Sequence, residues 1–300
     1  MTRTWATGMI QFTRRLGYWA VLIVLVDLIL ALFAAHLAPY NPAAQDLMAA
    51  NKGFSAAHLL GTDHLGRDTL SRLIAGSQTT LVAVAVVVLL AMTLGVLIGT
   101  ISGYVGGWID EITMRAVDFM LSVPSLIVAL AMIGIFGLGY WNMVAALTIA
   151  WIPSYARITR GVVVANVHQP HIESLWVLGA SRSRLIFLHL LPTATRSILV
   201  YASVDAGVLA LAIATLSFLG LGIQPPTAEW GEMFVDAMPY LDVSPRQIIL
   251  PGLALTLTVA GFNYLGERLA ALDAPRAIAG RQLRKRLAAA KGLQAPAVAK

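Results

Sequence analysis

The stretch that most limits what this chain can fold into is residues 79–101, an almost unbroken run of Val, Leu, Ala and Ile. About 20 apolar residues in a helix cross the hydrocarbon core of a bilayer. Only a membrane or a very large protein core can hide such a surface. Charged residues make up 12% of the chain, which is about half the share typical of soluble domains. The sequence therefore predicts an integral membrane protein.

Five further apolar segments have similar lengths, so we expect an all-α membrane protein with six transmembrane helices. The expected spans are residues 18–38, 79–101, 120–138, 143–163, 198–221 and 248–266. The first could also be a cleaved signal peptide, because arginines precede it. The apolar part of a signal peptide usually has only about 7–15 residues, so we favour an uncleaved anchor.

The positions of lysine and arginine predict the orientation of these spans. With six spans, both termini lie on one side of the membrane, and most of the 21 lysines and arginines lie there too. The four exceptions are Lys52, Arg67, Arg72 and Arg246. Cytoplasmic loops carry the excess of positive charge. We therefore expect both termini and residues 171–192 in the cytoplasm, and residues 39–77 and 223–245 outside.

The longest polar interruption in the second half of the chain begins after Pro170. A proline can open a helix because its missing N–H is not needed in the first turn. Glu173 then meets the positive end of the helix dipole, and Gly179 can take the left-handed conformation that ends the helix. Ser181 can cap a second helix, which we expect Pro192 to close. Two short helices joined at a glycine are predicted.

Two other interpretations fit the same segment. A glycine turn between helices, with arginines in the second helix, is also typical of a DNA-reading helix-turn-helix. The apolar spans on both sides argue against nucleic acid as a partner. A plain loop that only connects two spans is the other alternative.

A second polar region, at residues 39–77, contains Gly-Thr-Asp-His-Leu-Gly-Arg-Asp at positions 61–68. Two aspartates and two arginines lie close together there, which favours an ordered, self-paired loop. They are Asp63, Arg67, Asp68 and Arg72. His58, Asp63 and His64 could instead be metal ligands. No third histidine and no recognisable ligand spacing support that hypothesis, so no metal site is expected.

Signs of catalysis are lacking in the sequence. The chain has no cysteine and therefore no thiolate nucleophile or thiolate metal site. No Gly-x-x-x-x-Gly-Lys-Ser/Thr motif occurs, so we do not expect this chain to hydrolyse ATP or to hold a cofactor. Asp27 and Asp205 lie within predicted spans, where an ionisable residue is a functional candidate. Asp205 could line a translocation path, although a structural contact between helices is the favoured role.

Four motifs in the same order resemble one family, the permease subunits of ABC importers for dipeptides, oligopeptides and nickel. Glu173, Gly179 and the run His189-Leu-Leu-Pro192 resemble the cytoplasmic "EAA" loop of these permeases. Residues 61–68 resemble the Gly-Thr-Asp-x-x-Gly-Arg-Asp signature of one of the two permease partners. Residues 216–231 and 262–273 are also similar to the family.

The resemblance implies a type I ABC-importer permease fold with a cytoplasmic coupling helix that docks on a separate ATPase subunit. The implied coupling residues are Glu173, Leu175, Trp176, Gly179, Ala180, Ser181, His189 and Pro192. The implied residues of the extracytoplasmic signature loop are Gly61, Thr62, Asp63, Gly66, Arg67 and Asp68. The implied partners are a second homologous permease, two ATPase subunits that bind ATP and Mg, a solute-binding protein outside and membrane lipid.

The function implied is inward movement of short peptides across the cytoplasmic (inner) membrane, driven by ATP hydrolysis on the separate subunits. The same machinery carrying nickel or another small solute is the alternative. An ion-coupled secondary transporter, with Asp27 or Asp205 as its ion site, would not need a docking loop. A membrane enzyme would need a cluster of reactive groups at one depth, and none is visible.

We expect four regions along the chain. Residues 1–17 form a cytoplasmic N-terminal segment, and residues 18–78 form the first transmembrane helix with an extracytoplasmic loop. Residues 79–268 form the ABC transmembrane domain, with the EAA loop at 171–192. Residues 269–300 form a basic cytoplasmic tail, expected to be a solvated helix near anionic head groups.

Overall fold

The computed structural model of the protein describes residues 18–290, and most of that range is helical. Its one element of β structure there is an isolated antiparallel bridge between Thr62 and Asp68. The longer helices are α2 (Tyr18–Leu37), α3 (Thr69–Val105), α4 (Gly107–Leu121), α5 (Ser125–Phe136), α6 (Tyr140–Val167), α9 (Leu191–Phe218) and α11 (Arg246–Ala290). The shorter ones are η1 (Leu47–Ala49), α7 (Pro170–Val177), α8 (Arg182–Leu185), η2 (Ile186–Leu190), α10 (Trp230–Ala237) and η3 (Met238–Tyr240).

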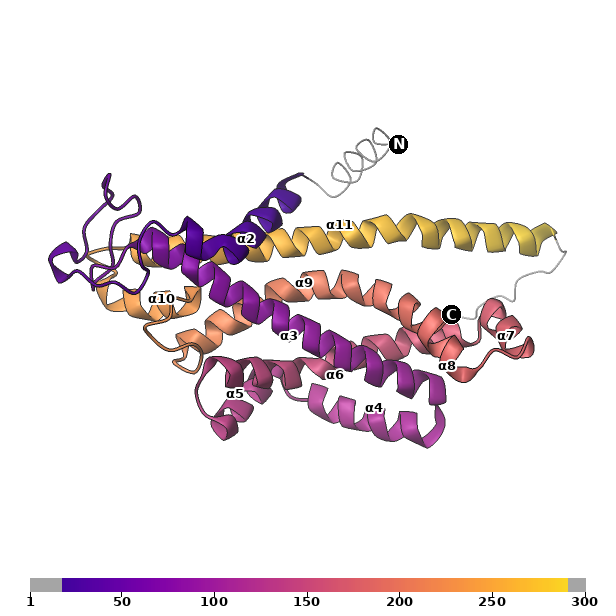
Figure 1. Ribbon diagram of the computed structural model, residues 1–300. Helices are drawn as coiled ribbons and strands as arrows, with labels where there is room; N and C mark the ends of the chain where they lie inside the picture. Colours follow the sequence, from indigo (N-terminus) through magenta and orange to yellow (C-terminus); the bar gives the residue numbers. More distant parts are fainter. Residues whose placement is uncertain (1–17, 291–300) are drawn as a thin grey trace.

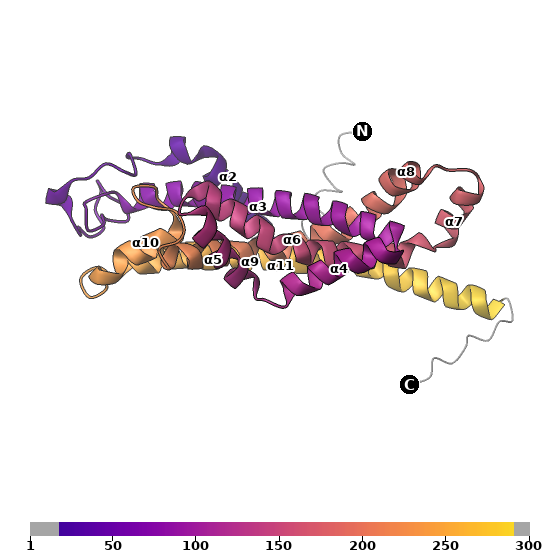
Figure 2. The ribbon, with the colours of Figure 1, turned by 90° about the horizontal axis from the view of Figure 1, so that it is seen from below.

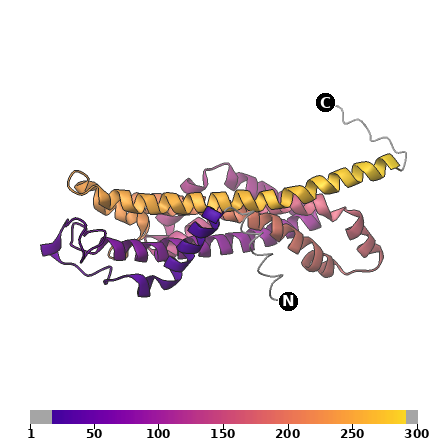
Figure 3. The ribbon, with the colours of Figure 1, turned by 90° about the horizontal axis from the view of Figure 1, so that it is seen from above.

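These helices form an elongated bundle with different polar structures at its two ends (Figure 1). The loop after α2 and the short helix α10 lie at one end, and α7 with α8 lies at the other. A quarter turn of the view keeps the same separation (Figure 2). Helix α11 runs along the length of the bundle and continues past it (Figure 3). The bundle therefore holds the two predicted functional segments far apart.

The centre of the bundle is the seam between α3 and α6. Gly95, Gly99 and Gly103 recur every fourth residue along α3, so they lie on one face of it. A side chain on Gly95 or Gly99 would overlap Tyr155 or the backbone of Ala156 on α6. Small residues at such spacing let two membrane helices approach closely. The seam covers one face of α3, and 39% of the most apolar window of this helix is buried.

The candidate membrane spans agree with the predicted all-α membrane protein, but their number differs from the predicted six. By length and apolar composition four helical stretches could cross a membrane, namely Tyr18–Leu37, Thr69–Val105, Arg182–Phe218 and Arg246–Ala271. The bent pair α4 and α5 would make a fifth. Helix α6, which contains the predicted span 143–163, is not among them. The expected count of six therefore remains a prediction.

The predicted span at 120–138 is not one continuous helix, because the chain bends there by 89° between α4 and α5. Pro124 begins α5 and has no N–H to continue the ladder of α4. A proline also disfavours helical geometry in the residue before it, here Val123. The helix must therefore end at Leu121 and restart in another direction.

The second predicted span begins earlier than expected, because α3 starts at Thr69. Asp68 caps this helix by accepting a hydrogen bond from the backbone N–H of Ser71. Asp68 thus sets the start of α3 ten residues before the apolar run.

Pro192 does not close the second helix of the 171–192 segment, which is a further correction. Helices α8, η2 and α9 follow one another without a break, and the N–H of Leu191 bonds to the carbonyl of Ile186, five residues back. This widened π-turn lies directly before Pro192, which falls in the first turn of α9, where an N–H is dispensable. The proline is accommodated inside a longer helix.

The predicted terminal segments lie partly outside the described residues. The N-terminal segment at 1–17 and the end of the tail at 291–300 lie outside the described range. The backbone of the tail is helical as far as Ala290, because α11 continues to that residue.

Candidate functional sites at the two ends of the bundle

The segment between α6 and α9 has the predicted helix–glycine–helix geometry. Gly179 has a φ of 84°, the left-handed conformation that favours glycine. The N–H of Ala180 bonds to the carbonyl of Leu175 and the N–H of Gly179 to that of Trp176, each at 3.0 Å. These two bonds end α7 as a Schellman motif. Ser181 then accepts a hydrogen bond from the N–H of Arg184 and caps α8.

One face of this segment is anchored to the bundle. Ile172 of α7 and Leu185 of α8 are buried in a small cluster with Val163, Leu190 and Ala194. These residues belong to α6, η2 and α9, so the two short helices are packed on the ends of the long ones. A displacement of α7 would therefore reach α6 and α9 directly.

The opposite face of the segment is apolar and exposed. Trp176, Val177 and Leu178 are 65%, 82% and 81% exposed, although they are adjacent in sequence. Beside them lies a groove of about 610 Å³, which Tyr104, Trp176 and others line. A contiguous apolar patch of this kind marks an interaction surface.

The predicted coupling residues do not all lie together. Glu173 is exposed in the first turn of α7, with one carboxylate oxygen 4.0 Å from Nδ1 of His168. Leu175, Ala180 and Ser181 lie at the corner beside Gly179. His189 and Pro192 lie farther along the chain, in η2 and at the start of α9. Val177 and Leu178 were not among the predicted coupling residues, although their place directly after Trp176 in the apolar run could have indicated them.

The signature loop at the other end is folded back on the start of α3. Gly61 and Gly66 both have positive φ, and Gly66 lies against the backbone carbonyl of Asp46, where a side chain would overlap. Thr62 is buried and pairs with Asp68 across the isolated bridge. The loop is therefore ordered, as predicted.

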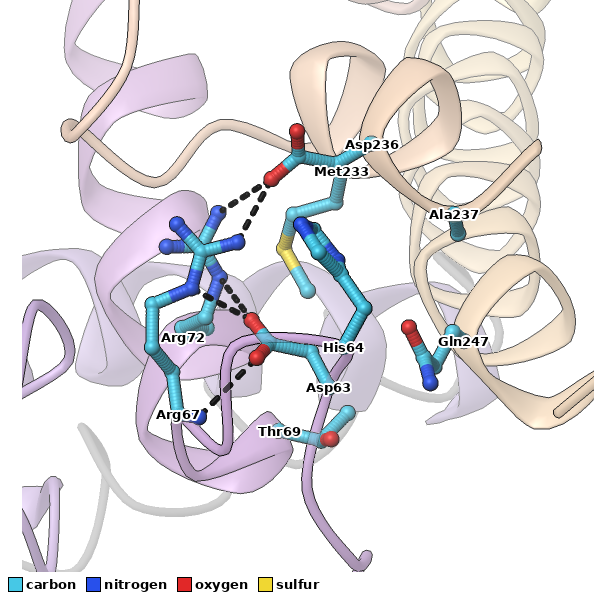
Figure 4. A pocket seen from close by; sticks show the side chains of 9 residues that line it. All are labelled: Asp63, His64, Arg67, Thr69, Arg72, Met233, Asp236, Ala237 and Gln247. Carbon is cyan, nitrogen blue, oxygen red and sulfur yellow. Dashed lines mark hydrogen bonds and ion pairs between the residues drawn. The ribbon is translucent and has the colours of Figure 1, made fainter. Parts of the chain in front are cut away.

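Its charged residues pair only partly with one another, and the remaining partners come from α10 (Figure 4). The side chain of Arg67 donates to Asp63 at 2.5 Å and to Asp236 at 2.6 Å. Arg72 donates to Glu232 at 2.9 Å. We did not predict the two α10 carboxylates. Acidic residues at 229, 232 and 236 recur at helical spacing, a signal that could have indicated them.

Two further contacts continue this pairing of α10 with α3. Glu229 is buried and accepts a hydrogen bond from the hydroxyl of Thr80 at 3.0 Å. The indole N–H of Trp230 donates to the carbonyl of Leu73 at 3.1 Å. Glu229, Trp230 and Glu232 thus join the segment 229–237 to α3, and Asp236 joins it to the loop before α3, so the outer end is one packed unit.

The alternative of a metal site in this loop is not supported by the geometry. Nδ1 of His58 lies 2.9 Å from a carboxylate oxygen of Asp68. His64 stacks on Tyr240, with ring centroids 4.6 Å apart. Within the described part of the chain, no group of three His, Cys, Asp or Glu side chains lies close enough to hold a metal ion.

Asp205 joins two of the long helices in the middle of the bundle. Its carboxylate on α9 accepts hydrogen bonds from the Trp151 indole at 3.2 Å and from the Tyr155 hydroxyl at 2.7 Å, both on α6. All three side chains are buried. This is the interhelical contact that we favoured, while a role in lining a translocation path remains a prediction.

Known proteins resemble this chain over most of its length. The family model described as "Binding-protein-dependent transport system inner membrane component" matches residues 95–278. The dipeptide transport system permease protein DppC of Escherichia coli K12 is 42% identical over 252 residues, covering 82% of this chain and 84% of the relative. The nickel transport system permease protein NikC of the same strain is 38% identical over 250 residues, covering 83% and 90%. The glutathione transport system permease protein GsiD of Pectobacterium atrosepticum is 40% identical over 251 residues, covering 83% of each chain.

Proposed function

The chain belongs to the family of binding-protein-dependent transport system inner membrane components, and from that premise we propose that it moves short peptides into the cell. As a member of that family it is the permease of a binding-protein-dependent ABC importer in the inner membrane. Its partners therefore include an ATPase and a solute-binding protein. A second permease and two ATPase subunits carrying ATP and Mg complete the proposed complex.

Peptides are the substrate class that the relatives favour. Two of the three relatives are named for a dipeptide and for glutathione, itself a short peptide, and they are 42% and 40% identical to this chain. The nickel permease is nearly as similar, at 38%. Nickel is therefore the second candidate substrate, carried by the same machinery.

One observation carries the mechanism: an apolar, anchored helix corner lies at the end of the bundle opposite the signature loop. Exposed Trp176, Val177 and Leu178 offer a docking surface to the ATPase subunit. Ile172 and Leu185 connect that corner to the ends of α6 and α9. Closure of the ATPase pair would move the corner, and α6 and α9 would transmit the motion toward α10. In this scheme Glu173 adds a negative charge at the start of the docking helix, and both termini lie in the cytoplasm.

A glycine substitution tests the coupling corner. Gly179→Val forces a β-branched side chain into the left-handed conformation, at a local cost of about 1–2 kcal/mol. No atom lies within 4 Å of the new Cβ, so the change tilts α7 without a core clash. We expect uptake of a radiolabelled dipeptide by the reconstituted complex to fall at least tenfold. The variant should still insert normally into the membrane, and less ATPase should co-purify with it.

The matched control is Gly220→Val, at the end of α9. Gly220 has a φ of 75°, its Cβ also meets open space, and the N–H groups of Gly220 and Leu221 close the same Schellman pattern, so the backbone strain is similar while the docking corner is untouched. Full transport by the Gly179 variant would contradict the coupling role.

Unlabelled glutathione and nickel, added as competitors, test the substrate class. Competition by nickel alone would replace peptides with the second candidate substrate.

A further inference from the structure

The outer end of the bundle contains a largely buried cluster with more acid than base; Figure 4 draws all of its members except Glu232. It holds three carboxylates and two guanidinium groups, linked by ion pairs between 2.5 and 3.7 Å long. The carboxylates are Asp63, Glu232 and Asp236, and the guanidinium groups are Arg67 and Arg72. The Glu232 side chain is 6% exposed and that of Arg72 is 2% exposed. The Asp236 side chain is 28% exposed, so the excess negative charge is costly when it lies on Glu232, which is away from water.

The other charged and titratable groups around the cluster are engaged elsewhere. Glu229 caps α10 and accepts from Thr80. Asp68 binds His58 and the start of α3. Arg246 of α11 donates to three backbone carbonyls of the outer loop, those of Asn51, Lys52 and Thr62. His64 faces the cluster while its ring lies on Tyr240 of η3.

Several buried polar atoms in and around the cluster have no hydrogen-bond partner. They include Oε1 of Glu232, Nη1 of Arg72, Nδ1 of His64 and Oγ1 of Thr69. Arg72, His64 and Thr69 line a cavity of about 10 Å³ together with Asp63 and Asp236 among others, and Glu232 is not one of its lining residues. A space of that size with several polar neighbours holds about one water molecule.

We propose that this cluster is a proton-binding site, in which one proton on Glu232 neutralises the excess charge and secures α10 to α3. A proton on Oε1 satisfies an atom that has no partner, and the carboxylate of Asp236, one turn along α10, is its acceptor. Arg67 and Arg72 then face two negative charges, on Asp63 and Asp236. This proposal goes beyond transport and does not depend on the substrate.

The electrostatics of Glu232 agree with this assignment. Burial raises the pKa of Glu232 from 4.5 to about 8, against the opposing effect of Arg72 and with a further contribution from Asp236. Because the folded-state pKa is the higher one, this group adds stability that is fully present below about pH 4.5. That stability is lost as the pH rises through about 8. The α3–α10 contact should therefore weaken in alkaline solution.

Two measurements on the full-length chain in lipid nanodiscs test the site. Difference infrared spectra between pH 6 and pH 9 should show the carbonyl band of a protonated carboxylic acid at pH 6, absent in Glu232→Gln. The apparent Tm should fall by about 3 °C or more from pH 6 to pH 9 in the unaltered chain and stay level in Glu232→Gln. Glu111→Gln on α4, an exposed partner of Arg115, is the matched control and should retain both effects.

A second variant keeps the proposal testable if Glu232→Gln fails to fold. Asp236→Asn removes the excess charge without touching Glu232, so its Tm should also become level with pH. An unchanged fall of Tm in both variants would overturn the proposal. So would a His64→Gln chain that loses the pH dependence, because the histidine would then be the group that titrates.

Discussion

At the scale of single residues, buried polar side chains on long helices determine which helices meet. Asp205 is the clearest case, because it accepts hydrogen bonds from two different side chains on α6. Each bond crosses from one helix to another in the interior, where neither donor has water as a substitute. Asp205 therefore contributes to the packing of α9 on α6 whether or not it also faces a path for solute.

Replacing Asp205 separates a packing role from a charge role. Asp205→Ala leaves the Trp151 indole and the Tyr155 hydroxyl without acceptors, and we expect a loss of about 1–2 kcal/mol per interhelical bond. Asp205→Asn keeps a carbonyl acceptor, so its loss of stability should be less than half that of Asp205→Ala. Thermal unfolding of the purified chain measures both. An Asn variant as unstable as the Ala variant would show that the charge itself is required.

At the scale of elements, close approach of α3 and α6 holds the bundle together. Three glycines at four-residue spacing make the approach possible, and the backbone of α6 fills the space that their side chains would occupy. Lipid does not drive apolar helices together, so this contact depends on the fit of the surfaces. The seam is therefore sensitive to added volume.

We expect Gly99→Val to destabilise the chain strongly. The new side chain would overlap the carbonyl of Ala156 and the side chain of Thr159 on α6. Overpacking a well-packed contact costs typically about 1–3 kcal/mol, and here backbone must move. The yield of folded monodisperse protein and its apparent Tm measure the effect. Gly161→Val on α6, where nothing lies within 4 Å, should leave both unchanged; equal losses in the two variants would count against the seam.

At the scale of the whole molecule, the coupling corner and the signature loop lie at opposite ends of the bundle (Figure 1). The long helices run between these ends, so a bilayer around the bundle places the two segments on opposite faces. The lysine and arginine pattern predicts that the proposed coupling corner faces the cytoplasm.

Single cysteines test that orientation, and the chain has none of its own to interfere. A cysteine at Ser55 or at Thr227 should react with a membrane-impermeant thiol reagent in intact cells, because both residues are exposed at the outer end. A cysteine at Ser183, exposed in α8, should react only after the membrane is permeabilised. The reverse pattern would invert the topology and with it the assignment of the coupling corner.

Local features of the chain were predictable from the sequence alone. The apolar runs indicate membrane helices because hydrophobic burial depends on composition over about 20 residues. Pro170, Gly179 and Ser181 indicate the helix corner because each acts on the backbone within a few residues of itself. The ordered outer loop was predictable because Asp63, Arg67, Asp68 and Arg72 are opposite charges that lie close together in the sequence.

Only the tertiary structure decided which distant groups meet and how the helices end. Arg67 and Asp236 are 169 residues apart in sequence, and Asp205 meets its partners across 50 and 54 residues. Nothing local encodes such pairs, because they depend on how α3, α6, α9 and α10 pack. Packing also lets the helix continue through Pro192, whereas α4 ends just before Pro124. A proline ends a helix unless a widened turn and the surrounding structure accommodate its ring, and that balance is set in three dimensions.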